Sequence, residues 1–477
     1  MASSDRIIYF FEGTKVRGNT TTSASVIKNF IPFSVGDPFN VDDPSIEHIR
    51  WRLMGTGWFN DVRLSLERGS KRGWIRLVVE VEERNTLIIT RVALGVSRDV
   101  KSNMKEESTE RYDLQPYAGI GLAETNLLGL GIGAAISGVY AESQYGLDLL
   151  YTDPIRLGGG FSLDGHFFYN HGREFFGRDE EDTEIDVSCI DPETDERIPG
   201  CEEELRAKTA VVRYDRFSLG IGTGHDITST LRYRIGWQGE FVDVTSKPNA
   251  ASIMRGAERV PIDFHIENDE SIVSSLYFSL IFDRRDNPPF PSRGQLIRLD
   301  ARIGAAWLGS SYDFARYETS FRHWQPLPWH HVFSVGVYLG AIYDDAPFFY
   351  RFYVSDLSDL IPSRILELNL DHRGAPNFLS TSIEAMRREE IAGKIDVEYN
   401  LPLHRGGGGF RGVDAYGRIG LYSLASWEDL RYAIRGYDGL ARIPLDLTFD
   451  LGIRADTTVG VFTFGVSTLV GFIPDPW

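Results

Sequence analysis

The sequence is poor in cysteine and methionine and has no long apolar run. Of its 477 residues, 2 are cysteine and 5 are methionine. No window approaches the roughly 18 uncharged apolar residues that a membrane-spanning helix requires. The opening residues, MASSDRIIYFFEGT, lack the basic start and apolar run of a signal peptide, so an exported protein with this sequence is expected to be a mature or trimmed form. These absences argue against a helical membrane protein. They leave open a membrane barrel, whose alternating strands give a weak hydropathy signal.

Basic residues are fewer than acidic ones, 50 against 68. The formal net charge is -18, which argues against a nucleic-acid partner because phosphate binding requires a basic surface that releases counterions. Much of the acid lies in blocks such as 106–110 and 179–186, which we predict to be solvated loops.

Motifs of catalysis and of cofactor binding are missing from the sequence. It contains no GxSxG, HExxH or Walker lysine motif, and its 10 histidines show no metal-ligand spacing. The GLGIG segment at 129–133 lies between predicted strands, which favours a turn over a phosphate cradle. We therefore expect no enzyme activity, no cofactor and no metal site.

The two cysteines lie in one segment, CIDPETDERIPGC. Their spacing is too wide for a redox CxxC motif, and no companion zinc ligands accompany them. We predict a disulfide between Cys189 and Cys201 within a loop, which implies an oxidising compartment. Two free thiols are the alternative.

Glycine and aromatic residues, in contrast, are abundant, with 48 Gly, 21 Tyr and 29 Phe. Such a composition is typical of β-structure with tight turns and aromatic girdles. We assign Trp324, Trp329, Tyr343 and the aromatic residues 348–350 to such girdles.

Residues 5–84 predict a small β-α-α-β-β module. A Thr or Ser within 20–23 can cap a first helix, and a second helix is predicted to begin at Pro44-Ser45 and end at Gly55 or Gly57. Two strands with alternating apolar residues then flank a turn at 69–73. The residues expected to face inward from the helices and strands are Val26, Ile27, Phe30, Ile31, Ile46, Ile49, Leu53, Val62, Leu64, Leu66, Ile75, Leu77, Val79 and Val81.

The order GNTTTSASVI, VGDPFN, GTGWFNDVRLSL and LVVEVEER resembles a POTRA domain, the periplasmic module of the superfamily of BamA, TamA and the two-partner-secretion transporters. The resemblance covers about 80 residues and sets the first domain at 1–84. It implies an exposed sheet edge that accepts a client polypeptide by β-strand addition. The alternative is that one such domain only plugs or orients a barrel.

From Thr86 onward the hydrophobic pattern has a period of two. In GKIDVEYNLPL the apolar residues Ile395, Val397, Tyr399 and Leu401 alternate with Lys394, Asp396, Glu398 and Asn400. One such strand fits a soluble sandwich as well as a barrel, so the number and spacing of the strands must decide.

The sequence predicts about fifteen such strands, joined alternately by tight turns and long polar loops. The long loops are 98–113, 173–209, 245–270, 343–392 and 425–442. Short turns at one rim and long loops at the other are typical of an outer-membrane barrel. We therefore expect 85–477 to form a transmembrane antiparallel β-barrel. Single-chain bacterial barrels have an even number of strands, which favours about 16.

A second motif supports the same superfamily. FDRRDNPPFPSRGQL resembles the turn after the eighth barrel strand of these proteins. Asp286, Asn287, Pro291 and Gly294 match its D-N-P-G pattern.

The sequence departs from the superfamily at the lock of the sixth extracellular loop. There an arginine of a (V/I)-R-G-(F/Y) motif usually folds into the lumen and meets an acid of the thirteenth strand. In the corresponding loop, 343–392, the match is Arg373-Gly374, with Ala375 where an aromatic residue belongs, and a true IRGY occurs at 434–437 in the next long loop. Arg418 lies near the expected position of the acid. Glu398, Asp396 or Asp414 could replace that acid, but we favour the interpretation that all of them line a wet lumen.

The resemblance implies a bacterial outer-membrane protein with its POTRA domain in the periplasm, which assists the insertion or translocation of other polypeptides. The expected partners are membrane lipid and client polypeptides, with accessory subunits or a homodimer left open. A passive pore, or a membrane anchor of a larger protein such as one bearing a patatin-like lipase, is the alternative. A soluble all-β surface protein is a weaker third interpretation.

Overall fold

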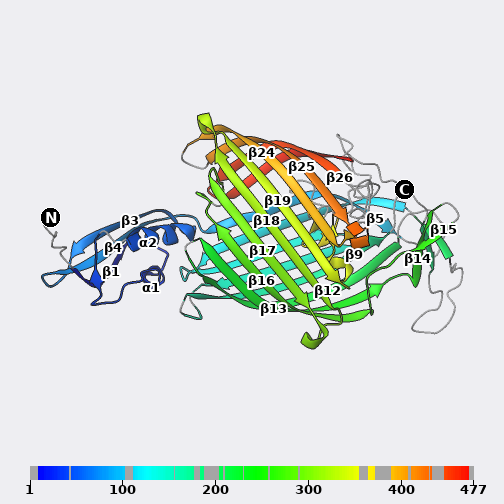
Figure 1. The fold of residues 1–477 in the computed structure, drawn as a ribbon, viewed down its shortest axis with the longest axis horizontal. Helices are drawn as coiled ribbons and strands as arrows, with labels where there is room; N and C mark the ends of the chain where they lie inside the picture. Colours follow the sequence, from blue (N-terminus) through cyan, green and yellow to red (C-terminus); the bar gives the residue numbers. More distant parts are fainter. Residues whose placement is uncertain are drawn as a thin grey trace.

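The protein consists of a small α+β domain followed by one large antiparallel sheet that curves into a barrel (Figure 1). The structure is a computed structural model that describes residues 9–41, 44–101, 111–154, 156–158, 160–176, 183–186, 204–207, 210–228, 230–255, 258–287, 290–353, 364–370, 388–406, 410–428, 430–431 and 445–471. The expected fold class is confirmed. Neither helix in these ranges is long and apolar enough to cross a membrane.

The small domain follows the predicted order with one short strand added. Its sheet has the order β2-β1-β4-β3, with β1 parallel to β4, and two helices pack on it. The added strand is β2, two residues long. The elements are β1 (Tyr9–Arg17), α1 (Ala24–Lys28), β2 (Pro38–Phe39), α2 (Pro44–Gly55), β3 (Phe59–Arg68) and β4 (Trp74–Glu83).

The core of this domain lies between the helices and the sheet. Val26 and Ile27 of α1 and Ile49 of α2 are buried against alternate residues of β4, as their helical and two-residue spacing predicted. Gly57, two residues beyond the end of α2, has φ +74°, a left-handed conformation that glycine adopts without steric cost. The other buried apolar residues of this core are Phe11, Phe39, Leu53, Trp58, Phe59, Val62, Ile75, Leu77, Val79 and Val81.

The barrel wall is a 15-stranded sheet in which sequential strands are neighbours throughout. Many strands run for 13 residues or more, as in β24 and β25, long enough for a tilted strand to cross a bilayer. The wall strands are β5 (Leu87–Lys101), β6 (Arg111–Leu127), β7 (Ile132–Ala141), β8 (Gln144–Asp153), β9 (Phe161–Phe176), β12 (Ala210–Asp226), β13 (Leu231–Ser246), β16 (Glu270–Asp283), β17 (Gly294–Gly304), β18 (Phe314–Pro326), β19 (Val332–Asp344), β24 (Ile391–Arg405), β25 (Phe410–Ala425), β26 (Leu445–Thr457) and β27 (Gly460–Gly471).

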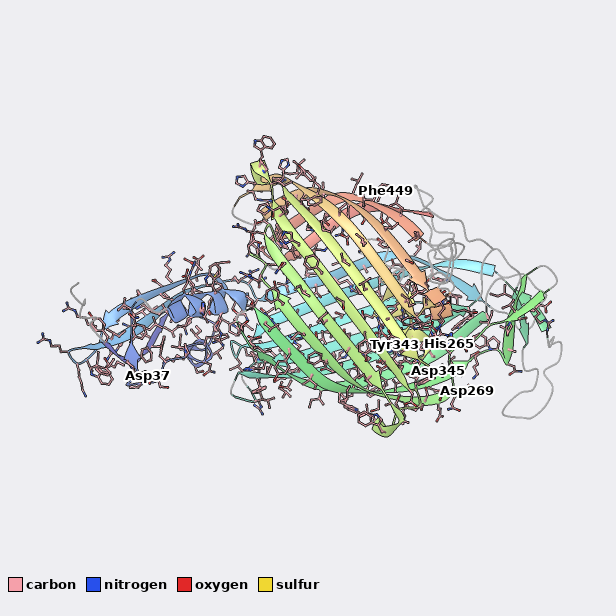
Figure 2. All side chains as sticks on the ribbon, viewed as in Figure 1. Asp37, His265, Asp269, Tyr343, Asp345 and Phe449 are labelled. Carbon is pink, nitrogen blue, oxygen red and sulfur yellow. The ribbon has the colours of Figure 1, made fainter. Side chains whose placement is uncertain are left out.

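The two faces of the wall have the reverse polarity of a soluble sheet. On β24, Ile395, Val397 and Tyr399 are exposed, whereas Asp396 and Glu398 between them are each only 2% exposed. On β26, the apolar Phe449 likewise stands off the outside of the wall (Figure 2). A sheet with apolar side chains outside and charges inside is stable when hydrocarbon surrounds it. The alternation seen in the sequence therefore marks a lipid-facing surface.

Over the described residues of β5 and β27, no ladder of hydrogen bonds joins the first and last strands of the wall. Because the wall has fifteen strands and neighbouring strands are antiparallel, β5 and β27 run in the same direction, away from the small domain. They meet near that domain, where Ile89 N–H donates to the Val459 carbonyl over 2.9 Å. The described residues contain fifteen wall strands rather than the sixteen we favoured.

Several long loops carry structure of their own at the barrel end away from the small domain (Figure 1). Two of them together form a sheet in the order β11-β10-β14-β15. The remaining elements are β10 (Thr183–Asp186), β11 (Glu204–Ala207), β14 (Ala250–Arg255), β15 (Glu258–Pro261), η1 (Ala306–Leu308), η2 (Pro328–His330), η3 (Phe348–Tyr350), β20 (Phe352–Tyr353), β21 (Arg364–Ile365), β22 (Leu368–Asn369) and β23 (Arg388–Glu389).

The small domain docks on the first short turn of the barrel, between β6 and β7. Trp58 Nε1 donates to the Thr125 carbonyl over 2.7 Å, and Asn126 Nδ2 donates to Thr22 Oγ1 over 2.8 Å. Gly129 has φ +71°, and a Cβ there would lie 2.0 Å from the Thr21 carbonyl oxygen. The GLGIG segment therefore does form a turn, and its glycines let the domain approach closely.

One carboxylate holds the docking loop in place from the other side. Glu83, at the end of β4, accepts hydrogen bonds from the backbone N–H of Thr20 at 3.0 Å, Thr21 at 2.8 Å and Thr22 at 2.6 Å. Partial burial by itself would raise the pKa of Glu83, but the hydrogen bonds from Thr20, Thr22 and Thr21 lower that pKa to about 2. The GNTTT and VEER segments of the sequence thus meet at these hydrogen bonds between Glu83 and 20–22, which we call the clasp.

Replacing Glu83 is expected to loosen the clasp. In Glu83→Gln, the amides of 20–22 lose about 2 kcal/mol of hydrogen-exchange protection, because charge-assisted bonds become neutral ones. The folded pKa of about 2 lies below the ordinary 4.5, so this stabilisation is complete above pH 4.5 and is lost as the pH falls toward 2. Glu82→Gln, an exposed neighbour, is the control. Equal protection in both variants would contradict the clasp.

If the outer face of the wall contacts lipid, a charged residue introduced there destabilises the protein, whereas a charged residue at an exposed site in water has little effect on stability. Leu219, in the middle of β12, is 55% exposed. Leu219→Lys should destabilise the protein in vesicles by about 3 kcal/mol, because a cation enters hydrocarbon. Val41→Lys, at an exposed site of the small domain, should change stability by less than about 0.5 kcal/mol. Denaturant titration in vesicles measures both, and a neutral Leu219→Lys would place water at that face.

Candidate functional site

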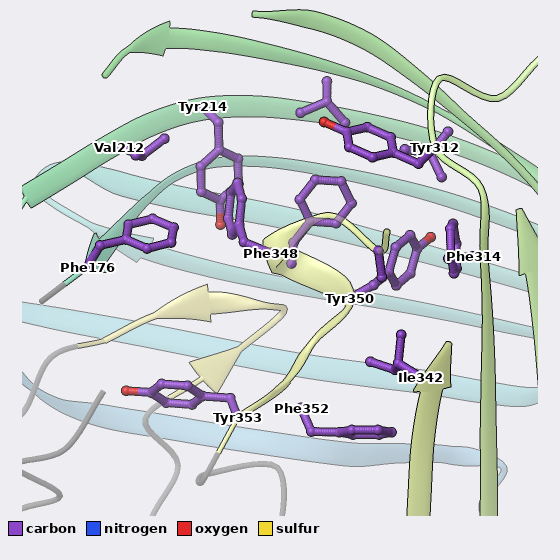
Figure 3. Close-up of a cluster of buried hydrophobic side chains, with 14 of the residues drawn as sticks. Phe176, Val212, Tyr214, Tyr312, Phe314, Ile342, Phe348, Tyr350, Phe352 and Tyr353 are labelled. Carbon is purple, nitrogen blue, oxygen red and sulfur yellow. The ribbon is translucent and has the colours of Figure 1, made fainter. Parts of the chain in front are cut away.

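The described residues of the loop between β19 and β24 place aromatic side chains in part of the barrel interior (Figure 3). Phe348 and Phe349 of η3 and Phe352 of β20 are buried there. Phe348 packs edge-on against Tyr214 of β12, with ring centroids 5.1 Å apart. Phe352 sits on the wall at Gly340, where a Cβ would lie 2.4 Å from its ring. The assignment of 348–350 to an aromatic girdle is therefore wrong, because these rings face the interior and not lipid.

A buried arginine joins this loop to the wall. Arg216 of β12 is 1% exposed and pairs with Glu240 of β13 at 2.7 Å. Its other terminal nitrogen pairs with Glu367, between β21 and β22, at 2.5 Å. The guanidinium carbon also lies 4.0 Å from the centre of the Phe349 ring. A buried cation is tolerated only with such partners, so Arg216 ties two parts of the loop to β12 and β13.

Tyr350 extends this network to further wall strands. Its hydroxyl donates to Glu240, and Arg302 of β17 donates to the hydroxyl oxygen over 2.9 Å. Arg316 of β18 donates to the Tyr350 carbonyl over 2.9 Å. Strands β12, β13, β17 and β18 therefore hold the loop by charge-assisted hydrogen bonds, the stronger class.

A second charged cluster lies on β24, β25 and β26. Glu398, only 2% exposed, pairs with Arg418 at 2.6 Å and Arg454 at 3.0 Å. Glu398 and Arg418 are direct cross-strand partners, which places both side chains on the inner face. Asp396 pairs with Arg322 of β18 at 2.6 Å across Gly336 of β19. A Cβ at Gly336 would lie 2.5 Å from both groups, so this glycine makes the bridge possible.

The structure thus brings together two of the lock candidates, Arg418 and Glu398, and pairs Asp414 with Arg405 instead. Glu398 is already neutralised by arginines of the wall. Arg373, Gly374 and the IRGY segment at 434–437 lie outside the described residues, as do Cys189 and Cys201.

The D-N-P-G segment forms the turn after β16, the eighth strand of the wall. Asp286 Oδ1 accepts hydrogen bonds from the backbone N–H of Asn287 at 3.0 Å, Ser292 at 2.9 Å and Arg293 at 3.0 Å. Burial would raise the pKa of Asp286, but these bonds and the Ser292 hydroxyl lower it. Gly294 has φ +108°, and a Cβ there would lie 2.1 Å from the Arg284 carbonyl oxygen. Pro291 lies in the same turn, so the motif acts structurally.

Sequence reasoning gave no site role to Arg216, Glu240 or Glu367, and it assigned Tyr350 to an aromatic girdle. Arg216 lies on the inner face of β12 with Tyr214 and Ser218, whereas the next residue, Phe217, lies on the outer face. The two-residue alternation of this strand could therefore have identified Arg216 as an interior residue. The aromatic run FFYRFY at 348–353, inside a polar loop, was the signal that this part of the loop packs inside the barrel. Across the described ranges, no three His, Cys, Asp or Glu side chains gather in a way that could hold a metal ion.

Comparison with known proteins agrees with this architecture. Residues 9–84 match the POTRA family, described as a surface antigen variable number repeat, and residues 126–358 match the Omp85 superfamily domain. The chain belongs to the Omp85 superfamily. Omp85 proteins such as BamA and CdiB mediate outer-membrane protein insertion or secretion, and they are not enzymes.

Solved Omp85 structures share the fold of this chain. BamA from Haemophilus ducreyi lacking POTRA domains 1–3 has a TM-score of 0.50 and 14% identity, over 98% of this chain and 82% of that one. CdiB from Escherichia coli gives 0.57 and 11%, over 97% and 73%. CdiB from Acinetobacter baumannii gives 0.51 and 10%, over 97% and 74%. At these identities the likeness shows the fold alone.

The Glu398 cluster is expected to be a major source of barrel stability. Glu398→Leu leaves Arg418 and Arg454 without their shared carboxylate, which should cost about 3 to 5 kcal/mol. The readout is the temperature at which the folded band on an unboiled gel converts to the unfolded one. Arg232→Ala, at the exposed pair with Asp226, should cost less than about 1 kcal/mol. Equal losses in the two variants would contradict this ranking.

Proposed function

We propose that this protein assists the insertion or translocation of other polypeptides at the bacterial outer membrane. Residues 1–84 would form its periplasmic POTRA domain and 85–477 its barrel. The observation that carries the proposal is the seam between β5 and β27, where no hydrogen-bond ladder joins the ends of the described wall. Unpaired backbone groups in hydrocarbon cost several kcal/mol each. A client strand that pairs with such an edge is stabilised, and so is the edge.

The edge of the POTRA sheet supports a role in client capture. β3 has β4 on one side only. Arg50 Nε of α2 donates to the Val62 carbonyl over 2.9 Å, so the backbone groups of Val62 point away from β4. Because these directions alternate along an antiparallel strand, the N–H and C=O groups of Leu64 and Leu66 also point outward. An extended client can add to these groups.

The position of the POTRA domain connects this edge to the seam. The linker residue Asn85 donates to the Thr458 carbonyl in the turn between β26 and β27, over 3.4 Å. Ile89 N–H, at the start of β5, bonds to Val459 in the same turn. A client bound by the POTRA domain would therefore be held close to the end of the seam.

The filled interior argues against a passive pore. Described loop residues pack against Tyr214, Phe314 and the Arg216 network inside the wall. Membrane lipid is the expected partner of the outer apolar face, and accessory subunits or a second copy are further possible partners of the POTRA domain.

Strand addition at the POTRA edge is tested by removing one outward N–H. Leu66→Pro deletes that donor at an edge position, where proline is tolerated. Leu66→Val reduces the side chain but keeps the N–H. We expect Leu66→Pro to slow insertion of an unfolded outer-membrane barrel into vesicles by about fivefold or more, and Leu66→Val to act like the wild type.

Planar-bilayer conductance of the same wild-type protein completes the test. The proposal requires insertion activity together with small, intermittent currents. Large steady currents without insertion activity would overturn it in favour of a passive pore. Equal insertion rates for the two Leu66 variants would exclude client addition at this edge.

A further inference from the structure

Five of the ten histidines lie at the rim of the barrel nearest the POTRA domain. His225 is the last residue but one of β12, and His404 is the last but one of β24. His323 lies near the end of β18, and His330 and His331 belong to the turn between β18 and β19. β12, β18 and β24 all end at this rim, because alternate strands of the wall run toward the POTRA domain. We call these five residues the histidine belt.

The belt borders the surface that contacts lipid. His225 lies directly opposite Phe161 of β9 and Tyr233 of β13, on the same face of β12 as the exposed apolar residues of the wall. On β18 the outward position of His323 follows from its neighbour Trp324, which is 7% exposed and faces the interior. The belt therefore lies where the apolar outer face ends and lipid head groups begin.

His225 is held by contacts that leave one ring nitrogen available. Its ring stacks on Phe161 with centroids 4.6 Å apart, and the Tyr233 ring lies 6.2 Å away. Its Nδ1 lies 3.0 Å from the Gly160 carbonyl oxygen. Because a carbonyl oxygen only accepts hydrogen bonds, Nδ1 carries the hydrogen and a second proton would enter at Nε2. The neighbouring aromatic rings favour the positive charge that such a proton brings.

The turn between β18 and β19 presents His331 in a similar setting. His331 Nδ1 shares a hydrogen bond with the Tyr399 hydroxyl of β24, and its ring lies 6.1 Å from that of Trp329. Trp329 and His330 have φ +60° and +63°, in the left-handed region that favours glycine. This unfavourable backbone turns Trp329 outward, where it is 83% exposed. An exposed indole beside histidines is typical of a site at lipid head groups.

In the part of the chain that the structure describes, neither His225 nor His331 has a carboxylate partner. The titratable groups that face them are the hydroxyls of Tyr233 and Tyr399. A proton taken up by either histidine therefore adds a positive charge that no acidic side chain beside it neutralises.

Fixed positive charges lie at the same rim. Arg156, in the turn between β8 and β9, and Arg284 and Arg293, in the turn between β16 and β17, are exposed and form no ion pair with described residues. The nearby acids have partners of their own: Asp226 pairs with an arginine of β13 at 3.8 Å, and Asp286 accepts N–H groups of its own turn. These arginines thus add to the attraction of the belt for anions.

The opposite boundary of the lipid-facing wall has the reverse charge. Asp215 of β12, Asp243 of β13 and Glu270 of β16 lie directly opposite one another in one outward row. The histidine of that row, His171, is paired with Asp215 at 2.9 Å. A lipid phosphate is repelled by these acids and attracted by the belt, so the two boundaries are not equivalent.

We propose that the histidine belt binds the phosphate groups of lipid head groups, and that this binding strengthens as the pH falls below neutral. Histidine is the side chain whose charge changes between about pH 5 and pH 8. Each cation near a membrane surface increases the attraction to anionic lipid, and salt screens it. The belt thus gives the barrel a pH-dependent hold on one leaflet. The identification of that leaflet as the periplasmic one rests on the proposed function.

The test measures which lipid the folded barrel prefers as its neighbour. The full chain is placed in phosphatidylcholine vesicles that contain a trace of spin-labelled phosphatidylglycerol or spin-labelled phosphatidylcholine. The motionally restricted fraction of each label gives the relative association constant of the two lipids. We expect the preference for phosphatidylglycerol to rise about twofold or more between about pH 8 and pH 5.5. Salt at about 1 M should remove the rise.

Two kinds of variant assign the rise to the belt. The triple variant His225→Gln, His331→Gln and His404→Gln removes three titrating groups and should lose most of the rise. His404→Arg places a permanent charge at an exposed position and should increase the preference already at about pH 8. His48→Arg, at an exposed site of α2 in the POTRA domain, is the matched control and should leave the preference unchanged. Gel mobility without boiling gives the folded fraction of each variant.

Three outcomes would overturn the proposal. They are a wild-type preference that does not change with pH, equal rises in the wild type and the triple variant, and a His404→Arg variant that behaves like His48→Arg. The last comparison decides the matter if the triple variant does not fold.

Inorganic phosphate, compared with chloride at the same ionic strength, separates a head group from a free anion. If phosphate alone removes the preference, the belt binds the free anion and the assignment to lipid is wrong. None of these measurements needs a client. A pH-dependent preference in a protein without insertion activity would therefore contradict the proposed function and leave the belt standing.

Discussion

The structure depends on one constraint: hydrocarbon offers no hydrogen bonds, so every backbone N–H and C=O of the wall must be paired inside the wall. A long antiparallel sheet meets this constraint everywhere except at its first and last strands. In the part of the wall that the structure describes, the seam between β5 and β27 is therefore a place where backbone groups lack a ladder of hydrogen bonds. The same constraint favours an apolar outer face and inward charges, such as Asp396 and Glu398 of β24. The proposed mechanism uses the place where this pairing ends.

Where charged side chains on the inner face of the wall are buried, each needs a group of opposite charge beside it. On one part of the wall they pair with each other, as Glu398 does with Arg418 and Arg454. On another part the wall has an arginine, Arg216, and the loop provides the carboxylate Glu367. Inward glycines such as Gly336 and Gly340 make room for these contacts, because any side chain there would occupy the same space. The abundance of glycine in the sequence thus has an interior function as well as its use in turns.

The POTRA domain and the barrel are connected through a small set of groups near the seam. Glu83 fixes the loop 20–22, that loop contacts the turn at Gly129, and Asn85 reaches the turn before β27. Each of these residues lies at the end of a strand or a few residues beyond it, where backbone groups are free to bond outside their own sheet. The position of the POTRA domain and the geometry of the seam are therefore linked by short chain segments with little freedom.

The sequence by itself determined the POTRA elements, the alternation of the wall strands and the positions of the short turns, because these follow from local periodicity and turn residues. It also identified Arg418 and Glu398 as interior residues, since each lies on the polar side of its own strand. Only the tertiary structure decided that Phe348 to Tyr350 fill the interior and that Glu367 meets Arg216, 151 residues away in the chain. A period of two gives the face on which a side chain lies, but not the register between distant strands or the path of a loop. Those depend on closure of the whole sheet, which brings residues from opposite ends of the chain into contact.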